Sequence, residues 1–327
     1  MIITRTPMRI SLGGGGTDLP AYYRKAGKGF LIAAAISKYV YIAVNRTFDD
    51  SILLKYSQLE HVDDPADVKH PLLRECMMAT GVTRSLEISA MADIPAGTGL
   101  GSSGAFTVGV LKALHAYRHE IEPNERIASR ACDIEIGRLG EPSGKQDPYI
   151  AAIGGLTAFE FHADESVAVI PVPLADGVRH RIEENLVLFY TGLRRPASEV
   201  LAIEQSARSD AAAKLDENLD AVRAIGYETM DALTAGHVGD FGELLTRQWR
   251  LKLDRSPTPT HQRVDDWIAR GVDAGAAGGK LVGAGGGGFL LFYAEYKADL
   301  RDAMAELGLP EVRFAFDYHG TTTIIAG

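Results

Sequence analysis

Short runs of apolar and β-branched residues dominate the chain up to residue 91. They have the length and composition of strands and fall at residues 2–4, 9–12, 30–36, 39–46, 52–56 and 86–91. Such a series of short strands predicts a predominantly antiparallel sheet in the N-terminal part of the chain.

The pattern changes after Pro95, where a glycine-rich stretch leads into apolar residues at helical spacing. These apolar positions share one helical face: Phe106, Val110, Leu111 and Leu114. A second helical pattern covers residues 123–139, and two strand-like runs follow at 156–161 and 167–172. The middle of the chain therefore predicts two helices and then two strands.

A polar stretch over residues 175–185 precedes the last third of the chain, and we place a domain boundary there. The expected domains are residues 1–180 and 181–327. The second domain begins with a strand-like run at 186–190. It continues with helical patterns up to about residue 252 and over 262–274, and strands flank a glycine run. The pattern predicts an α+β fold.

Composition and charge narrow the function. The chain has 327 residues, of which 46% are hydrophobic, enough for a sizeable core. Its formal net charge of −9 provides no basic surface for nucleic acid or an anionic membrane. We therefore expect neither partner. An anionic small molecule would have to be held by local backbone N–H groups and a few cations.

The cysteines and the N-terminus bear on the compartment. Cys76 and Cys132 are the only cysteines, too few for a disulfide framework or a zinc cluster, so we expect core thiols. The start of the chain lacks a charged leader followed by an apolar stretch, and no apolar run approaches about 18 residues. We expect a cytoplasmic protein.

The most informative motif is PAGTGLGSSG at residues 95–104, between a strand-like run and a helix. Glycines allow close backbone approach and positive φ, and the first helical turn offers unpaired N–H donors at the positive end of the helix dipole. A triphosphate fits such a loop. Alternatively, Ser102 or Ser103 only caps the helix, since serine is a preferred N-cap residue.

Other nucleotide folds fit less well. Residues 99–104 satisfy the dinucleotide GxGxxG pattern, but the next predicted element, 123–139, is a helix and not the parallel strand that a Rossmann unit needs. No GxxxxGK followed by Ser or Thr occurs, nor any HRD or DFG set. The glycine run at 283–288 connects two strand-like runs, so it closes a hairpin or lines a ligand.

Two carboxylates have settings suited to phosphoryl transfer. Glu135 falls on the apolar stripe of its predicted helix, and a buried carboxylate needs a partner, either a magnesium ion or an arginine. Asp147 lies in the turn-rich segment PSGKQDP, where a side chain can be aimed at a ligand, although turn chemistry alone would also explain an aspartate.

Taken together, these residues resemble the GHMP kinases, named for galactokinase, homoserine kinase, mevalonate kinase and phosphomevalonate kinase. The motifs that carry the resemblance occur in family order: PMR to Asp18 near the start, PxxxGLGSS at 95–103 and the glycine run at 283–288. Three stretches are similar to the D-glycero-D-manno-heptose 7-phosphate kinases: RTPMRISLGGGGTDLPAYY at 5–23, SGKQD at 143–147 and FYTGLRR at 189–195.

The resemblance implies an N-terminal domain like ribosomal protein S5 domain 2, a C-terminal ferredoxin-like domain and an active site between them. It implies Asp147 as the base, Arg9 near the reacting hydroxyl, and Ser103 with Glu135 as Mg²⁺ ligands. The residues expected to hold ATP are Pro95, Gly97, Gly99, Leu100, Gly101, Ser102 and Ser103. Those expected on the substrate side are Gly15, Thr17, Asp18, Lys145, Gln146, Arg194, Gly285 and Gly286.

The implied reaction is ATP-dependent phosphorylation of the anomeric hydroxyl of a sugar phosphate, giving a 1-phosphate. A substrate that already bears a 7-phosphate needs a second anion pocket, for which Lys145, Arg194 and Arg195 are the candidates. The chain departs from galactokinases at residues 14–16, so galactose is not expected. An L-fucose-type kinase and a non-catalytic sugar-binding homologue remain alternatives, as does a homo-oligomer.

Overall fold

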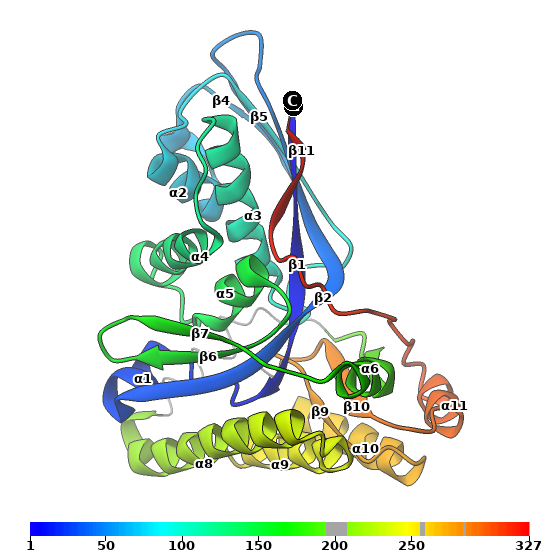
Figure 1. Ribbon diagram of the computed structural model, residues 1–327. Coiled ribbons are helices and arrows are strands. Elements are labelled where there is room, and N and C mark those ends of the chain that lie inside the picture. Colours follow the sequence, from blue (N-terminus) through cyan, green and yellow to red (C-terminus); the bar gives the residue numbers. More distant parts are fainter. Residues whose placement is uncertain (194–207, 256–258, 284–285, 327) are drawn as a thin grey trace.

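The computed structural model describes residues 1–193, 208–255, 259–283 and 286–326, and side chains except those of 208–212 and 259. It contains two sheets (Figure 1). The larger sheet has the strand order β11-β1-β2-β5-β3-β4, with β6 pairing β2 and β7 pairing β6. Its strands are β1 (Ile2–Gly13), β2 (Lys28–Asn45), β3 (Ile52–Lys55), β4 (Leu59–Val62), β5 (Leu86–Ala92), β6 (Leu156–His162), β7 (Val167–Pro171) and β11 (Thr322–Ala326).

The predicted antiparallel character holds for most of this sheet, but β3 and β5 pair in parallel. Strands expected as separate pairs are merged into the long strands β1 and β2. The β1–β2 register shifts between Pro7 and Met8, a local irregularity that interrupts the pattern without ending the strand. Met8 and Ile10, which follow the shift, are fully buried, so β1 crosses the core before it ends at Gly13.

Helices cover one side of the larger sheet (Figure 1). They are α2 (Pro71–Thr80), α3 (Ser102–Tyr117), α4 (Asn124–Cys132) and α5 (Gln146–Ile153), while α1 (Pro20–Ala26) lies at the start of β2. α3 packs closely on β1 at Gly109, where a β-carbon would lie 2.9 Å from Thr6 Oγ1. The close approach brings the N-terminus of α3 beside the end of β1.

The second helical pattern is not a single α-helix. α4 ends at Cys132, and the backbone continues as a π-helical segment, η2 (Asp133–Arg138). A π-helical turn changes the direction in which side chains project, and such turns often occur at functional sites. Here it carries Glu135, which is buried.

The smaller sheet has the order β8-β10-β9. Its elements and the helices packed beside it are β8 (Leu186–Tyr190), β9 (Gly278–Leu281), β10 (Phe289–Tyr293), α8 (Arg208–Ala235), α9 (Phe241–Arg255), α10 (Pro259–Asp273) and α11 (Ala298–Glu306). Trp249 and Phe292 are buried in a separate core cluster on this sheet. The α8 helix lies across the start of β2, where Tyr227 stacks on Phe30 at a ring-centroid distance of 4.0 Å.

The polar stretch at 175–185, where the domain boundary was placed, forms α6 (Asp176–Asn185). Ile182 is fully buried and Val178 packs against the same core cluster, so apolar contacts that composition does not reveal anchor the helix. The chain also returns to the larger sheet at its end, where β11 pairs with β1. The division at about residue 180 therefore remains a prediction. Within the described residues, none of the helices combines the length and apolar character needed to cross a membrane.

Candidate active site

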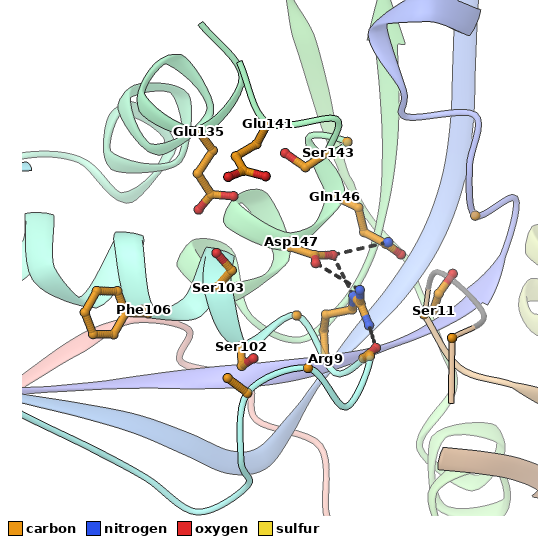
Figure 2. A pocket seen from close by; sticks show the side chains of 18 of the residues that line it. Arg9, Ser11, Ser102, Ser103, Phe106, Glu135, Glu141, Ser143, Gln146 and Asp147 are labelled. Carbon is orange, nitrogen blue, oxygen red and sulfur yellow. Dashed lines mark hydrogen bonds and ion pairs between the residues drawn. The ribbon is translucent and has the colours of Figure 1, made fainter. Parts of the chain in front are cut away.

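A cavity of about 970 Å³ lies where the loops of the two sheets meet. Its wall includes the end of β1, the glycine-rich loop before α3, the π-helical segment, the start of α5, and parts of α9 and β9. Figure 2 shows Phe106 at one side of the cavity and Ser11 at the other, with Arg9 and Asp147 between them. Residues from both ends of the chain thus converge on one space.

The loop before α3 has the geometry that its glycines predict. Gly97, Gly99 and Gly101 have φ angles of 76°, 79° and 73°, in the left-handed region that favours glycine. Gly101 is the N-cap residue of α3, and no described side chain caps this helix end. Ser102 and Ser103 lie in the first turn, so the alternative that they cap the helix is wrong. The first-turn N–H groups remain available to an anion.

The second glycine run supports the first. A β-carbon on Gly283 would lie 2.5 Å from the carbonyl oxygen of Gly99, and one on Gly288 would lie 1.9 Å from that of Thr98. Since β9 and β10 pair antiparallel, the run closes a hairpin. Gly286 also lines the cavity, whereas Gly285 lies outside the described residues. Hairpin closure is thus confirmed, and contact of this run with a ligand stays a prediction.

Arg9 and Asp147 form a two-point ion pair. Arg9 Nε donates to Asp147 Oδ1 at 2.7 Å, and a terminal nitrogen donates to Oδ2 at 3.0 Å (Figure 2). The Arg9 side chain is 5% exposed and that of Asp147 is 29% exposed, so the carboxylate is open to the cavity while the arginine is not. The same guanidinium donates to Gly99 O. The pair thereby connects the start of α5 to the glycine loop.

Close packing also explains the glycine at position 104. A β-carbon there would lie 2.7 Å from Asp147 Cβ and 2.8 Å from the backbone N of Pro148. Such separations require the neighbouring backbone to shift. In this chain, glycine at position 104 lets the start of α5 approach α3, which sets the position of Asp147.

Polar groups gather on the Ser11 side of the cavity. Asp18 is 4% exposed and accepts hydrogen bonds from the backbone N–H groups of Gly16 and Gln146, each at 3.1 Å. Burial, and secondarily the charge of Asp147, raise the pKa of Asp18. Ser11 Oγ and Gln146 Oε1 are buried and have no hydrogen-bond partner among the described residues. These atoms are placed to receive a polar ligand.

Two expected substrate contacts are wrong in this structure. The Thr17 hydroxyl is buried against the backbone of Gly14 and Phe30 and does not line the cavity. Lys145 points away, with its Nζ 2.8 Å from a carboxylate oxygen of Glu165. The positions of Thr17 and Lys145 in their motifs predicted contact with the substrate, but the direction of each side chain leads away from the cavity. Gly15 does line the cavity, and Arg194 and Arg195 lie outside the described residues.

Glu135 and Ser103 are the expected metal ligands. Thr107 Oγ1 donates to Glu135 Oε1 at 2.6 Å, and Figure 2 shows the carboxylate beside Ser103 and Glu141. Burial raises the pKa of Glu135 to about 7, although the Thr107 hydrogen bond opposes this shift. No cluster of three His, Cys, Asp or Glu side chains suited to a metal occurs in the described ranges. A buried carboxylate and a hydroxyl fit Mg²⁺, which commonly binds one or two carboxylates together with substrate phosphates.

An aromatic cluster that sequence patterns did not identify lines the other side. The His70 ring stacks on Phe106 at 5.0 Å between centroids, and Tyr56 packs edge-on against His70 at 4.7 Å. These side chains come from three separate segments, so no local motif connects them. They provide a flat apolar surface of the kind that holds an aromatic ring.

Three cations also line the cavity and were missed: Lys252 and Arg255 on α9, and Lys280 on β9. Lys280 is 6% exposed, and its Nζ donates to Gln248 Oε1 at 3.0 Å. Burial, together with the positive charges of Lys252 and Arg9, lowers the pKa of Lys280 to about 7. The sequence feature that could have identified Lys280 is a lysine within a strand-like run next to a glycine run.

The fold and the cavity define a two-domain phosphotransferase. A glycine loop leaves open helix N–H groups, donors of the kind that suit phosphates, and a fixed carboxylate faces the same space. The family model for the GHMP kinases N terminal domain matches residues 69–155, and that for the GHMP kinases C terminal matches residues 229–308. This chain belongs to the GHMP kinases, ATP-dependent enzymes that transfer a phosphoryl group to an alcohol.

Relatives and solved structures agree with this family. The chain is 28% identical over 309 residues to a D-glycero-alpha-D-manno-heptose 7-phosphate kinase of Campylobacter jejuni, covering 90% of this chain and 89% of the relative. It is 25% identical to an Arabidopsis thaliana bifunctional fucokinase/GDP-fucose pyrophosphorylase, covering 92% of this chain but 31% of that protein. A D-glycero-D-manno-heptose 1-phosphate kinase from Bacteroides thetaiotaomicron has the same fold, with TM-score 0.80, 24% identity and 99% coverage of both chains.

Proposed function

We propose that this chain uses ATP to phosphorylate the anomeric hydroxyl of D-glycero-D-manno-heptose 7-phosphate, giving the 1,7-bisphosphate. The observation that carries the proposal is the Asp147 carboxylate, which Arg9 fixes and which faces the cavity. Beside it lie Ser11 Oγ and Gln146 Oε1, for which the described part of the chain provides no hydrogen-bond partner. A polyhydroxylated acceptor can satisfy such groups. The similarity to the Campylobacter jejuni heptose 7-phosphate kinase supports the choice of sugar.

Asp147 is the proposed base. Both of its oxygens accept from Arg9, and Oδ2, which accepts from Arg9 alone among the described residues, has a further lone pair for a substrate hydroxyl. The anomeric oxygen attacks the γ-phosphorus of ATP, its proton passes to Asp147, and the bond to the β–γ bridging oxygen breaks to release ADP. Arg9 holds the carboxylate in one orientation throughout, and Gln146 Nε2 donates to the same carboxylate at 3.3 Å.

The glycine loop and the first turn of α3 would bind the triphosphate. Backbone N–H groups at this helix start offset negative charge on the phosphates. Glu135 and Ser103 would hold Mg²⁺, which when bound neutralises part of the triphosphate charge. The surface formed by Tyr56, His70 and Phe106 would take the adenine ring. This order places the acceptor sugar on the Ser11 side.

The substrate is tested by measuring ADP release with a panel of sugars. We expect turnover with heptose 7-phosphate, and a new phosphate ester at the anomeric carbon by ³¹P NMR. Turnover with L-fucose in place of the heptose would instead favour the function named for the Arabidopsis thaliana relative. ATP binding without turnover of any sugar would support a non-catalytic homologue and reject the proposal.

A further inference from the structure

The Ser11 side of the cavity carries a concentration of positive charge that the reaction at Asp147 does not use. Lys252, Arg255 and Lys280, here called the cation cluster, all line this cavity. The chain as a whole has a formal net charge of −9, so the cluster is a local exception to a predominantly acidic protein. A local exception of this kind inside a cavity favours an anionic ligand.

Contacts within the cluster place it near the acceptor end. Lys280 Nζ lies 3.5 Å from the carbonyl oxygen of Leu12, the residue after Ser11. A β-carbon on Gly16 would lie 3.7 Å from a guanidinium nitrogen of Arg255. Figure 2 places Ser11 across Asp147 from Phe106. Lys280 and Arg255 therefore lie on the sugar side of the proposed base, away from the aromatic surface. Lys252, whose charge acts on Lys280, donates from its Nζ to Gly283 O at the glycine run.

Lys280 is the most informative member of the cluster. Its hydrogen-bond partners in the described part of the chain are Gln248 Oε1 and Leu12 O, both uncharged, and no described carboxylate forms an ion pair with it. Burying a charged amine without a counter-charge is unfavourable. The low pKa of Lys280 agrees with this cost. An anionic ligand in the cavity would supply the missing negative charge.

We propose that Lys252, Arg255 and Lys280 form a subsite for a second anionic group on the acceptor, the phosphate remote from the hydroxyl that is phosphorylated. The inference rests on the proposed sugar kinase function and names the residues that distinguish a sugar phosphate from the free sugar. The cation cluster thus has the phosphate-binding role expected of Lys145, whose amine is directed to Glu165 instead.

Two variants test this subsite: Lys280→Met and Arg255→Gln, in case one of them does not fold. Kinetics are measured with D-glycero-D-manno-heptose 7-phosphate and with the heptose lacking the phosphate. We expect each variant to raise the KM for the 7-phosphate roughly ten- to hundredfold, the range for a charge-assisted hydrogen bond. The KM for ATP and for the free heptose should stay the same. Titration calorimetry without ATP should show the same selective loss of affinity.

The matched control is Lys112→Met. Lys112 lies on α3, donates to Asn124 Oδ1 at 2.9 Å and does not line the cavity. This variant should bind both sugars like the unmodified chain. An equal change for both sugars in Lys280→Met, or a rise in the KM for ATP alone, would overturn the subsite while leaving the kinase function intact.

If the unmodified chain phosphorylates neither heptose, the proposed substrate fails, and the cation cluster is tested with inorganic phosphate alone. Phosphate should then raise the melting temperature of the unmodified chain and of Lys112→Met, but not that of Lys280→Met. An equal rise in all three proteins would overturn the subsite. The two proposals therefore fail on different measurements.

Discussion

Gly99 and Gly283 contact each other main chain to main chain, although 184 positions separate them in the sequence. The β-carbon that Gly99 lacks would lie 2.7 Å from Val282 O, and the one that Gly283 lacks would lie 2.5 Å from Gly99 O. Lys252 Nζ also donates to Gly283 O, at 3.3 Å. The C-terminal hairpin thus fixes the shape of the loop proposed to hold ATP.

Gly283→Ala should raise the KM for ATP by roughly tenfold, because the added methyl group displaces the backbone of the glycine loop proposed to hold ATP. The left-handed conformation of residue 283 adds about 1 kcal/mol of backbone strain. Initial rates at varied ATP measure the effect. Gly308→Ala is the control for strain alone: Gly308 has φ 71° and nothing within 4 Å of its β-carbon position. That variant should lose a little stability and keep its KM. Equal KM values in both variants would contradict a support role for Gly283.

Asp147→Asn should reduce turnover roughly a hundredfold or more, the range for loss of a general base, while ATP still binds. Single-turnover rates and a fluorescent nucleotide titration measure the two effects separately. Asp176→Asn serves as the control, since Asp176 pairs with Arg179 on the surface of α6, with its side chain 88% exposed. Turnover near that of the unmodified chain would remove Asp147 from the proposed role.

Glu135→Gln should weaken metal binding at the site and leave the fold intact. We expect the Mg²⁺ concentration for half-maximal activity to rise by at least roughly tenfold, the loss seen even for groups that only orient a metal ligand. Mn²⁺ binding in the presence of ADP, followed by electron paramagnetic resonance, provides a readout independent of turnover. Glu75→Gln, which alters an ion pair with Arg138 outside the cavity, should change neither value.

Glu165 predicts a pH-dependent contribution to stability. Burial would raise its pKa, but hydrogen bonds from Arg24, Lys145 and Tyr23 outweigh burial and lower it from 4.5 to about 2. A carboxylate whose pKa is lower in the folded state stabilises the fold above its unfolded pKa, and this stabilisation is lost as pH falls through the folded value. Glu165→Gln should therefore destabilise the chain at neutral pH by about 1 kcal/mol, a modest figure because 44% of the side chain is exposed to solvent screening.

Urea unfolding between about pH 7 and pH 3 measures this difference. The gap between the unmodified chain and Glu165→Gln should narrow as pH falls below about 4.5, because the unfolded glutamate then takes up a proton. A gap of constant size across the range would mean that the glutamine acts through packing and not through lost charge.

Local periodicity predicted much of the fold. The strand-like run at 186–190 and the helical faces of α3 and α10 follow from spacing alone, because side chains on one face of an element must be buried together. Prediction failed where few side chains decided the structure. Ile182 and Val178 pack α6 against the core although the stretch is mostly polar, and the π-helical segment replaces the end of a regular helix.

The amino-acid sequence by itself predicted the glycine-rich loop and the open start of α3, because positive φ angles and open helix N–H groups are local properties of PAGTGLGSS. It also made Arg9, Glu135 and Asp147 candidates, and membership of the GHMP kinases followed from motifs in order. Only the tertiary structure decided which side chains face the cavity. It directed Lys145 to Glu165, buried Thr17, and brought Lys280 from β9 beside the end of β1. Direction and long-range contact depend on how distant elements pack, and no local pattern encodes that packing.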